Sequence, residues 1–212
     1  MKNLKLEANI LSIACLEASY WWVNWEEHYH KTLIKWNQES SSQFSRDDKT
    51  LFCNFIAKYS LQRSIPGGEK AQKQLLEKIK DAGFFDKAKT GEPFIDDFAK
   101  QNRHNDKMLI SLYSKLATLI NPAAYTMYDN RAKVGLARMI KGQESMSTHK
   151  SYHGFYYDWE KVYDFIKTKE ALISKHKRYL ETHFEIDKTL LTTEIYIRRV
   201  VDKYLWHYGG ED

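Results

Sequence analysis

Very few residues in this chain can interrupt a helix. Only three prolines and nine glycines occur among its 212 residues, and Lys, Glu, Leu, Ala and Gln, which favour helix over strand, make up much of the rest. The sequence therefore predicts an all-α fold, compact and built of about nine helices. We expect one domain over residues 1–212, with residues 1–45 plus 150–212 and residues 46–149 as candidate lobes on either side of a cleft.

Hydrophobic periodicity delimits several of these helices. Between residues 106 and 120 the apolar side chains recur at helical spacing, at Met108, Leu109, Leu112, Leu116 and Leu119, which predicts a helix buried on one side. Asn121-Pro122 ends it. We also expect helices over 49–63, capped by Asp47 or Asp48, and over 69–82, 94–101, 158–182 and 189–207. The first 40 residues are helical in character, and a further helix begins at Asn130.

Several classes of protein are disfavoured by what the sequence lacks. It has no run of about 18 apolar residues and no secretory signal pattern, so we expect a soluble, cytoplasmic protein without membrane contact. Cys15 and Cys53 lie among apolar residues, which favours buried free thiols over a disulfide or a zinc site. The glycine motifs of P-loop, dinucleotide-binding and α/β-hydrolase enzymes do not occur.

A metal site is a weaker hypothesis, and it would involve Glu26, Glu27, His28 and His30. Residues two apart on a helix point to different faces, and the HExxH spacing that suits zinc does not occur. A structural or surface role is the better interpretation of these histidines, and no metal or cofactor is expected.

Positive charge is concentrated in one segment of a chain whose formal net charge is only +5. Between residues 130 and 150 a single acid, Glu144, accompanies five basic residues: Arg131, Lys133, Arg138, Lys141 and Lys150. A solvated helix face explains this pattern, and so does a surface for a polyanion such as nucleic acid.

The same region carries a resemblance to a known family. The segment 114-SKLATLINPAAYTMYDNRAKVGL-136 resembles a set of largely uncharacterised bacterial proteins in which an S-K motif precedes P-x-x-[FY]-x-[IM]-[YW]-D-[SN]. Those proteins are similar to distant members of the helix-hairpin-helix DNA glycosylase superfamily. The C-terminal 198-RRVVDKYLWHYGG-210 resembles the ending of the same set.

The resemblance implies a function and a set of site residues. Asp129 falls where the superfamily has an aspartate that opens a helix and faces an extruded nucleotide, so it is the candidate catalytic carboxylate for N-glycosidic bond hydrolysis. The implied partner is DNA, with phosphate contacts from Lys115, Arg131, Lys133, Arg138 and Lys141. The candidate base pocket consists of Trp21, Trp22, Trp25, Tyr125 and Tyr128. For Asp129 the alternative is an ordinary helix cap, and for the aromatic residues it is core packing.

One departure from the superfamily bears on catalysis. Members with a lyase step carry a glycine-rich hairpin whose lysine lies about 18 residues before the aspartate, whereas this chain has no glycine between Gly91 and Gly135. Lys115 lies 14 residues before Asp129 and Lys107 lies 22 before it, and neither spacing fits a Schiff-base nucleophile. We therefore expect either a monofunctional glycosylase that removes a damaged or modified base, with defence against phage DNA as a plausible role, or a non-catalytic DNA- or protein-binding subunit of a bacterial defence complex.

Overall fold

A computed structural model describes residues 4, 6–38, 44–141 and 149–210, and for residues 37, 38 and 141 it describes the backbone alone. In these ranges the regular structure is helical, as predicted, and no strand is present apart from one isolated bridge between His104 and Lys107. None of the helices in these ranges is long and apolar enough to cross a membrane.

The chain begins with one long helical run that changes its winding. Helix α1 (Ala8–Trp21) continues into a π-helical turn, η1 (Trp22–Glu26), and then into α2 (Glu27–Gln38). A π-helical turn widens the backbone and is frequent at functional sites. Here it brings Glu26 into the interior, where its side chain is fully buried.

The middle of the chain consists of shorter helices. These are α3 (Arg46–Lys58), the 3₁₀ turn η2 (Gln62–Ser64), α4 (Gly68–Asp81), α5 (Phe84–Thr90), α6 (Ile95–Gln101) and α7 (Ile110–Ile120). Helix α7 is almost entirely buried and contacts α2, α5 and α6. The predicted half-buried helix over 106–120 is therefore shorter and more enclosed than expected.

A tight turn without glycine joins α6 to α7. His104 and Lys107 exchange two backbone hydrogen bonds of 3.0 Å, and Asn105 and Asp106 between them have φ values of 48° and 60°. Asn and Asp tolerate this left-handed conformation better than other residues with a side chain. The chain thus forms a helix, a two-residue hairpin turn and a second helix where no glycine is available.

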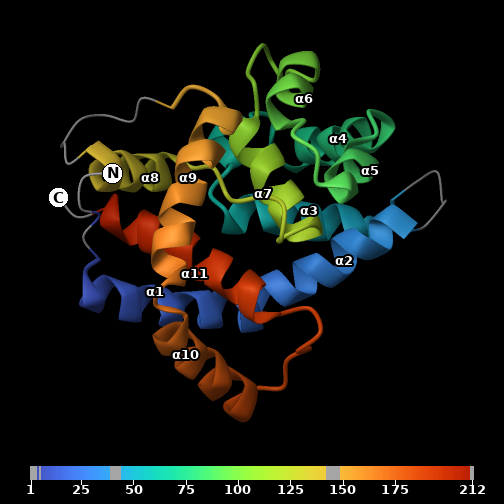
Figure 1. Ribbon diagram of the computed structural model, residues 1–212. Helices are drawn as coiled ribbons and strands as arrows, with labels where there is room; N and C mark the ends of the chain where they lie inside the picture. The colour runs from blue at the N-terminus through green and yellow to red at the C-terminus, as the bar shows by residue number, and fades with distance from the viewer. Residues whose placement is uncertain (1–3, 5, 39–43, 142–148, 211–212) are drawn as a thin grey trace.

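The C-terminal half packs around one central helix (Figure 1). Helix α11 (Thr193–Tyr208) contacts α1, α8 (Asn130–Lys141), α9 (Tyr152–Lys167) and α10 (Glu170–His183). The single helix predicted over 158–182 is therefore wrong, because the chain turns at Thr168-Lys169 between α9 and α10. The crossing of α8 and α11 is so close that a Cβ on Gly135 would lie 2.0 Å from the carbonyl oxygen of Leu205.

Candidate functional site

An extended segment, residues 125–129, leads into α8 and is held from two sides. On one side the hydroxyl of Ser114 in α7 accepts a hydrogen bond from the Tyr128 N–H at 3.0 Å. On the other, the Tyr152 hydroxyl of α9 accepts one from the Thr126 N–H at 2.9 Å. Because both bonds are buried, the backbone immediately before Asp129 has one well-defined position.

Asp129 uses its two carboxylate oxygens differently. Oδ1 accepts a hydrogen bond from the Ala132 N–H at 2.8 Å, which is the N-cap interaction for α8. Oδ2 lies 3.9 Å from the Nζ of Lys115, and 27% of the Asp129 side chain is exposed. Asp129 therefore caps its helix and still presents an oxygen outside the helix.

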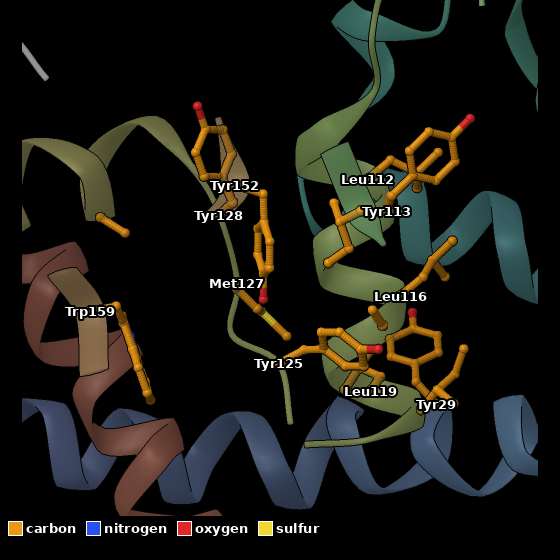
Figure 2. Packing of buried hydrophobic residues seen from close by; sticks show 14 of the residues in the cluster. Tyr29, Leu112, Tyr113, Leu116, Leu119, Tyr125, Met127, Tyr128, Tyr152 and Trp159 are labelled. Carbon is orange, nitrogen blue, oxygen red and sulfur yellow. The ribbon is translucent and has the colours of Figure 1, made fainter. Parts of the chain in front are cut away.

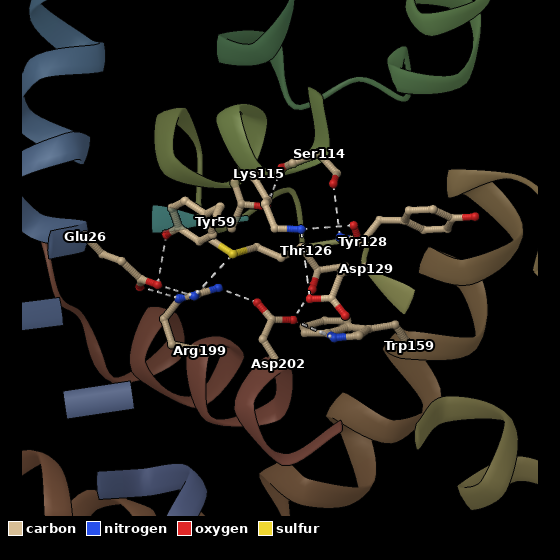
Figure 3. Close-up of polar contacts among 12 residues, drawn as sticks. Glu26, Tyr59, Ser114, Lys115, Thr126, Tyr128, Asp129, Trp159, Arg199 and Asp202 are labelled. Carbon is tan, nitrogen blue, oxygen red and sulfur yellow. Dashed lines mark hydrogen bonds and ion pairs between the residues drawn. The ribbon is translucent and has the colours of Figure 1, made fainter. Parts of the chain in front are cut away.

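Lys115 is an interior residue and is enclosed beside this carboxylate (Figure 3). Its Nζ donates hydrogen bonds to the Ser111 hydroxyl at 2.9 Å and to the Tyr128 carbonyl oxygen at 3.3 Å. Burial lowers the pKa of the Lys115 amine, although the charges of Asp129 and Asp202 act in the opposite direction. A buried amine with three oxygens around it is poorly placed for the surface phosphate contact predicted for Lys115, and its contacts place it with Asp129 instead.

Asp129 and Lys115 both line a cleft of about 1060 Å³. The walls come from α1, α11, the start of α8 and the turn between α3 and α4. Beside the pair, four further cationic side chains line the cleft and form no salt bridge with any residue of the described ranges: Lys58, Arg63, Arg131 and Lys203. Three aromatic side chains line it as well: Trp21, Tyr59 and Trp206. A concave, cationic and partly aromatic surface suits a ligand that carries both phosphate and planar rings.

Cations lie against the aromatic rings of this cleft. The guanidinium of Arg131 is 4.3 Å from the Trp206 ring centroid, and the Nζ of Lys203 is 3.8 Å from that of Trp21. Trp206 was not among the predicted pocket residues. It falls inside the C-terminal segment that carries the family resemblance, but no spacing rule distinguishes it there from the other aromatic residues of α11.

Beneath the cleft, α11 forms a buried ionic cluster with η1 (Figure 3). The Nε and Nη2 of Arg199 donate to the two oxygens of Glu26 at 2.7 and 2.5 Å, and Nη1 pairs with Asp202. Asp202 in turn accepts hydrogen bonds from Thr126 and from the Trp159 Nε1. The cluster therefore ties α11 and η1 to the extended segment that ends in Asp129.

Burial acts differently on the acids of this cluster. It opposes ionisation of Glu26, but the charges of Arg199 and Lys203 and the hydrogen bonds from Arg199 outweigh it, so the pKa of Glu26 lies below its usual value. For Asp202 burial dominates and raises the pKa, against the influence of Arg199 and Thr126. Sequence reasoning did not identify Arg199 or Asp202, and it considered Glu26 only as a metal ligand.

The predicted base pocket is largely core. Trp22, Tyr125 and Tyr128 are at most 8% exposed, and Figure 2 shows Tyr125 and Tyr128 among packed hydrophobic side chains. Their hydroxyls donate to backbone carbonyl oxygens, from Tyr125 to Glu92 and from Tyr128 to His149. Trp25 lines a different, shallow pocket. Of the five predicted aromatic residues, only Trp21 lines the cleft with Asp129.

The basic residues of α8 do not share one face. Arg131 is exposed at the cleft, whereas Lys133 lies over the Tyr128 ring at 4.8 Å and burial lowers its pKa against the influence of Asp129. Arg138 donates to the Tyr208 carbonyl oxygen at 3.1 Å. The side chain of Lys141 lies outside the described residues. Among the predicted phosphate contacts, Arg131 is thus the one whose exposed side chain lines the cleft.

The histidine cluster near the N-terminus has structural partners. The His30 Nδ1 is 2.5 Å from the Leu119 carbonyl oxygen, and Glu26 belongs to the ionic cluster. Across the described ranges, no three His, Cys, Asp or Glu side chains are grouped so that they could hold a metal ion.

Comparisons with protein-family models, with curated proteins and with solved structures found no match to this chain. The candidate site therefore has to be interpreted from its own geometry and chemistry.

Proposed function

We propose that this protein removes a damaged or modified base from DNA by hydrolysing its N-glycosidic bond, with Asp129 as the carboxylate at the reacting sugar. The observation that carries the proposal is the placement of Asp129, whose Oδ2 is turned to Lys115 in a cationic cleft. The extended segment that leads from α7 to Asp129, and the resemblance of residues 114–136 to the glycosylase superfamily, support the same proposal.

The chemistry requires a negative charge beside C1′ of the sugar. When the bond between C1′ and the base nitrogen breaks, the bonding electrons leave with the base and positive charge develops on the sugar. A carboxylate stabilises this charge, and it accepts a proton from the water that then adds to C1′. Asp129 is suited to this role, because one oxygen is fixed by α8 while the other remains available.

Lys115 is a positioning residue under this proposal. Its amine joins α7 to the Tyr128 carbonyl oxygen and lies beside Asp129, so it fixes the carboxylate and balances its charge. The same amine could attack C1′ itself if it lost its proton, which would form a covalent imine with the opened sugar and release the base. Borohydride reduction distinguishes the two mechanisms, since only an imine becomes trapped on the protein. We expect no trapped species.

Base release from defined oligonucleotides tests the function. Duplexes with a single uracil, oxidised, alkylated or glucosylated base are incubated with the protein, and abasic sites are scored by strand cleavage after alkali. The Asp129→Asn variant is the matched comparison, because asparagine caps a helix as well as aspartate does. We expect this variant to fold normally and to lose about 10²-fold or more of the rate, as for removal of a general base.

Two results would contradict the proposal. Undiminished base release by Asp129→Asn removes Asp129 from the chemistry. DNA binding without release of any base in the panel favours the alternative, a non-catalytic binding subunit that uses the same cleft.

A further inference from the structure

Two lysines from distant parts of the chain converge on one ring in the cleft. Lys203 of α11 lies 3.8 Å from the centroid of Trp21, at the end of α1, and Lys58, at the end of α3, lies 5.2 Å from the same centroid. Both lysines line the cleft that contains Asp129. We call these three residues the lysine–tryptophan site.

Neither ammonium group has an acceptor among the residues that the structure describes. Within the described ranges, no hydrogen bond or ion pair is made by Lys58 or Lys203, and their contacts are with tryptophan rings. Ring contacts offset only part of the cost of desolvating an ammonium group. Burial lowers the pKa of Lys203 to about 8, although Glu26 favours the charged form.

The nearby carboxylates are already engaged. Glu26 and Asp202 are bound by Arg199, and Glu17 lies 3.2 Å from His207. Lys58 and Lys203 therefore both border the Trp21 ring, and within the described ranges neither forms an ion pair with these carboxylates, although their charges favour the charged form of Lys203. An anionic ligand bound in the cleft would supply both ammonium groups with a partner.

The surroundings indicate the class of anion. The lysine–tryptophan site lies in the same cleft as Asp129, and Arg63 on the turn after α3 adds a further exposed cation. A row of cations with an interleaved aromatic ring is typical of surfaces that follow a nucleic-acid strand, where ammonium groups contact phosphates and rings contact bases or sugars.

We infer that Lys58 and Lys203 bind a backbone phosphate of the DNA strand whose nucleotide reaches Asp129. The inference rests on the proposed function for its ligand. It also moves the main phosphate contact from the basic helix α8 to α3 and α11, which form another wall of the cleft. Lys203 and Lys58 then hold the strand while Asp129 faces the sugar.

Salt dependence of binding measures the contact directly. The affinity for a fluorescent duplex with a tetrahydrofuran abasic analogue is followed by anisotropy over a range of salt concentrations. Loss of one lysine that contacts a phosphate should lower the slope of log K against log salt by about 1. We expect this for Lys203→Gln and for Lys58→Gln, whereas Lys203→Arg should keep the slope because it keeps the charge. Lys175→Gln, which removes a lysine on α10 outside the cleft, is the matched control.

Substitution on the DNA identifies the source of the anion. The phosphates near the abasic analogue are replaced one at a time by an uncharged methylphosphonate. At one position along the strand, the replacement should weaken binding by the wild type and leave binding by Lys203→Gln unchanged. If inorganic phosphate competes for binding and no methylphosphonate position has this effect, the site binds a free anion. That result would overturn the strand contact.

The outcomes separate this inference from the proposed function. Unchanged slopes in both glutamine variants, or no measurable DNA binding by the wild type, overturn the inference. If Lys203→Gln keeps the wild-type salt dependence of binding and releases base normally, the proposed function stays intact. A lowered slope without base release by the wild type supports the lysine–tryptophan site and removes the proposed reaction.

Discussion

Replacing Arg199 by methionine should destabilise the fold by about 3–5 kcal/mol, which is the usual cost of removing one partner from a buried ion pair. The side chain of Arg199 is 2% exposed and that of Glu26 is fully buried. Without the guanidinium, Glu26 loses its ion pair in the interior and keeps the Tyr59 hydroxyl, at 3.2 Å, and the influence of the Lys203 charge. Asp202 loses less, since it still accepts hydrogen bonds from Thr126 and Trp159.

A second substitution tests whether the lost free energy of unfolding comes from the unpaired charge of Glu26. Adding Glu26→Gln to Arg199→Met removes the charge and leaves a side chain that still reaches Tyr59, so the double variant should be more stable than Arg199→Met alone. Urea unfolding followed by circular dichroism gives the free energies of unfolding. Lys73→Met, which breaks an exposed pair with Glu69, should leave the urea midpoint unchanged and serves as the control.

The pH dependence has a definite sign. In the wild type the pKa of Glu26 is below its usual value of 4.5, so its contribution to stability is present above pH 4.5 and is lost as the pH falls through the folded-state pKa. In Arg199→Met the unpaired Glu26 is protonated more readily than in the unfolded chain. The difference in unfolding free energy between the two proteins should therefore begin to narrow above pH 4.5, where Glu26 of the variant is protonated, and should narrow further below pH 4.5, where the wild type loses stability. A loss of unfolding free energy smaller than about 1 kcal/mol in Arg199→Met would refute this account of the cluster. A double variant that is no more stable than Arg199→Met would also refute it.

Three further results are expected. Gly135→Ala should cost about 3 kcal/mol, because its Cβ would meet the Leu205 carbonyl oxygen, whereas Gly154→Ala should cost far less in thermal denaturation. Ser45→Ala should cost about 1 kcal/mol in the same assay, since the Ser45 side chain and Asp48 form a capping box. The Lys203 amine, followed by NMR after reductive methylation, should titrate near pH 8. Between there and its unfolded value of 10.5 the unfolded chain binds more protons, so the contribution of Lys203 to the free energy of unfolding rises with pH.

The all-α class could be predicted from local sequence features, because these features do not depend on how the helices pack together. The scarcity of proline and glycine predicted the helical class correctly, whereas the apolar spacing before Asn121 predicted a helix that in the structure begins four residues later, at Ile110. The break between α9 and α10 was missed, because Thr168 and Lys169 are neither helix breakers nor strong turn formers. The N-cap of α3 was predicted two or three residues too late, at Asp47 or Asp48. Ser45 is the N-cap, and Asp48 occupies the third position of the helix.

The candidate site could be predicted from the sequence only where a motif marks it. The resemblance assigns a role to Asp129 but none to Trp206 or Lys203, which lie on a helix that is buried over most of its surface. The turn of α11 that borders the cleft depends on how α1 and α8 pack against α11 and on where the segment after α3 lies. No residue spacing within α11 encodes that. The same packing placed Tyr125 and Tyr128 in the core, although their position before Asp129 suggested a pocket.

The pairing of Lys115 with Asp129 shows why a spacing along the chain is a poor measure of distance between side chains. A helix advances about 1.5 Å per residue and an extended segment about 3.3 Å. After Lys115 the chain completes α7, turns at 121–124 and returns as the extended segment, so a few residues retrace the last turns of the helix. Fourteen residues therefore suffice to bring Nζ within 3.9 Å of Oδ2. For the proposed reaction, the choice between hydrolysis and attack by the amine then depends on whether Lys115 keeps its proton. Its hydrogen bonds to two oxygens favour the protonated form, and its burial opposes it.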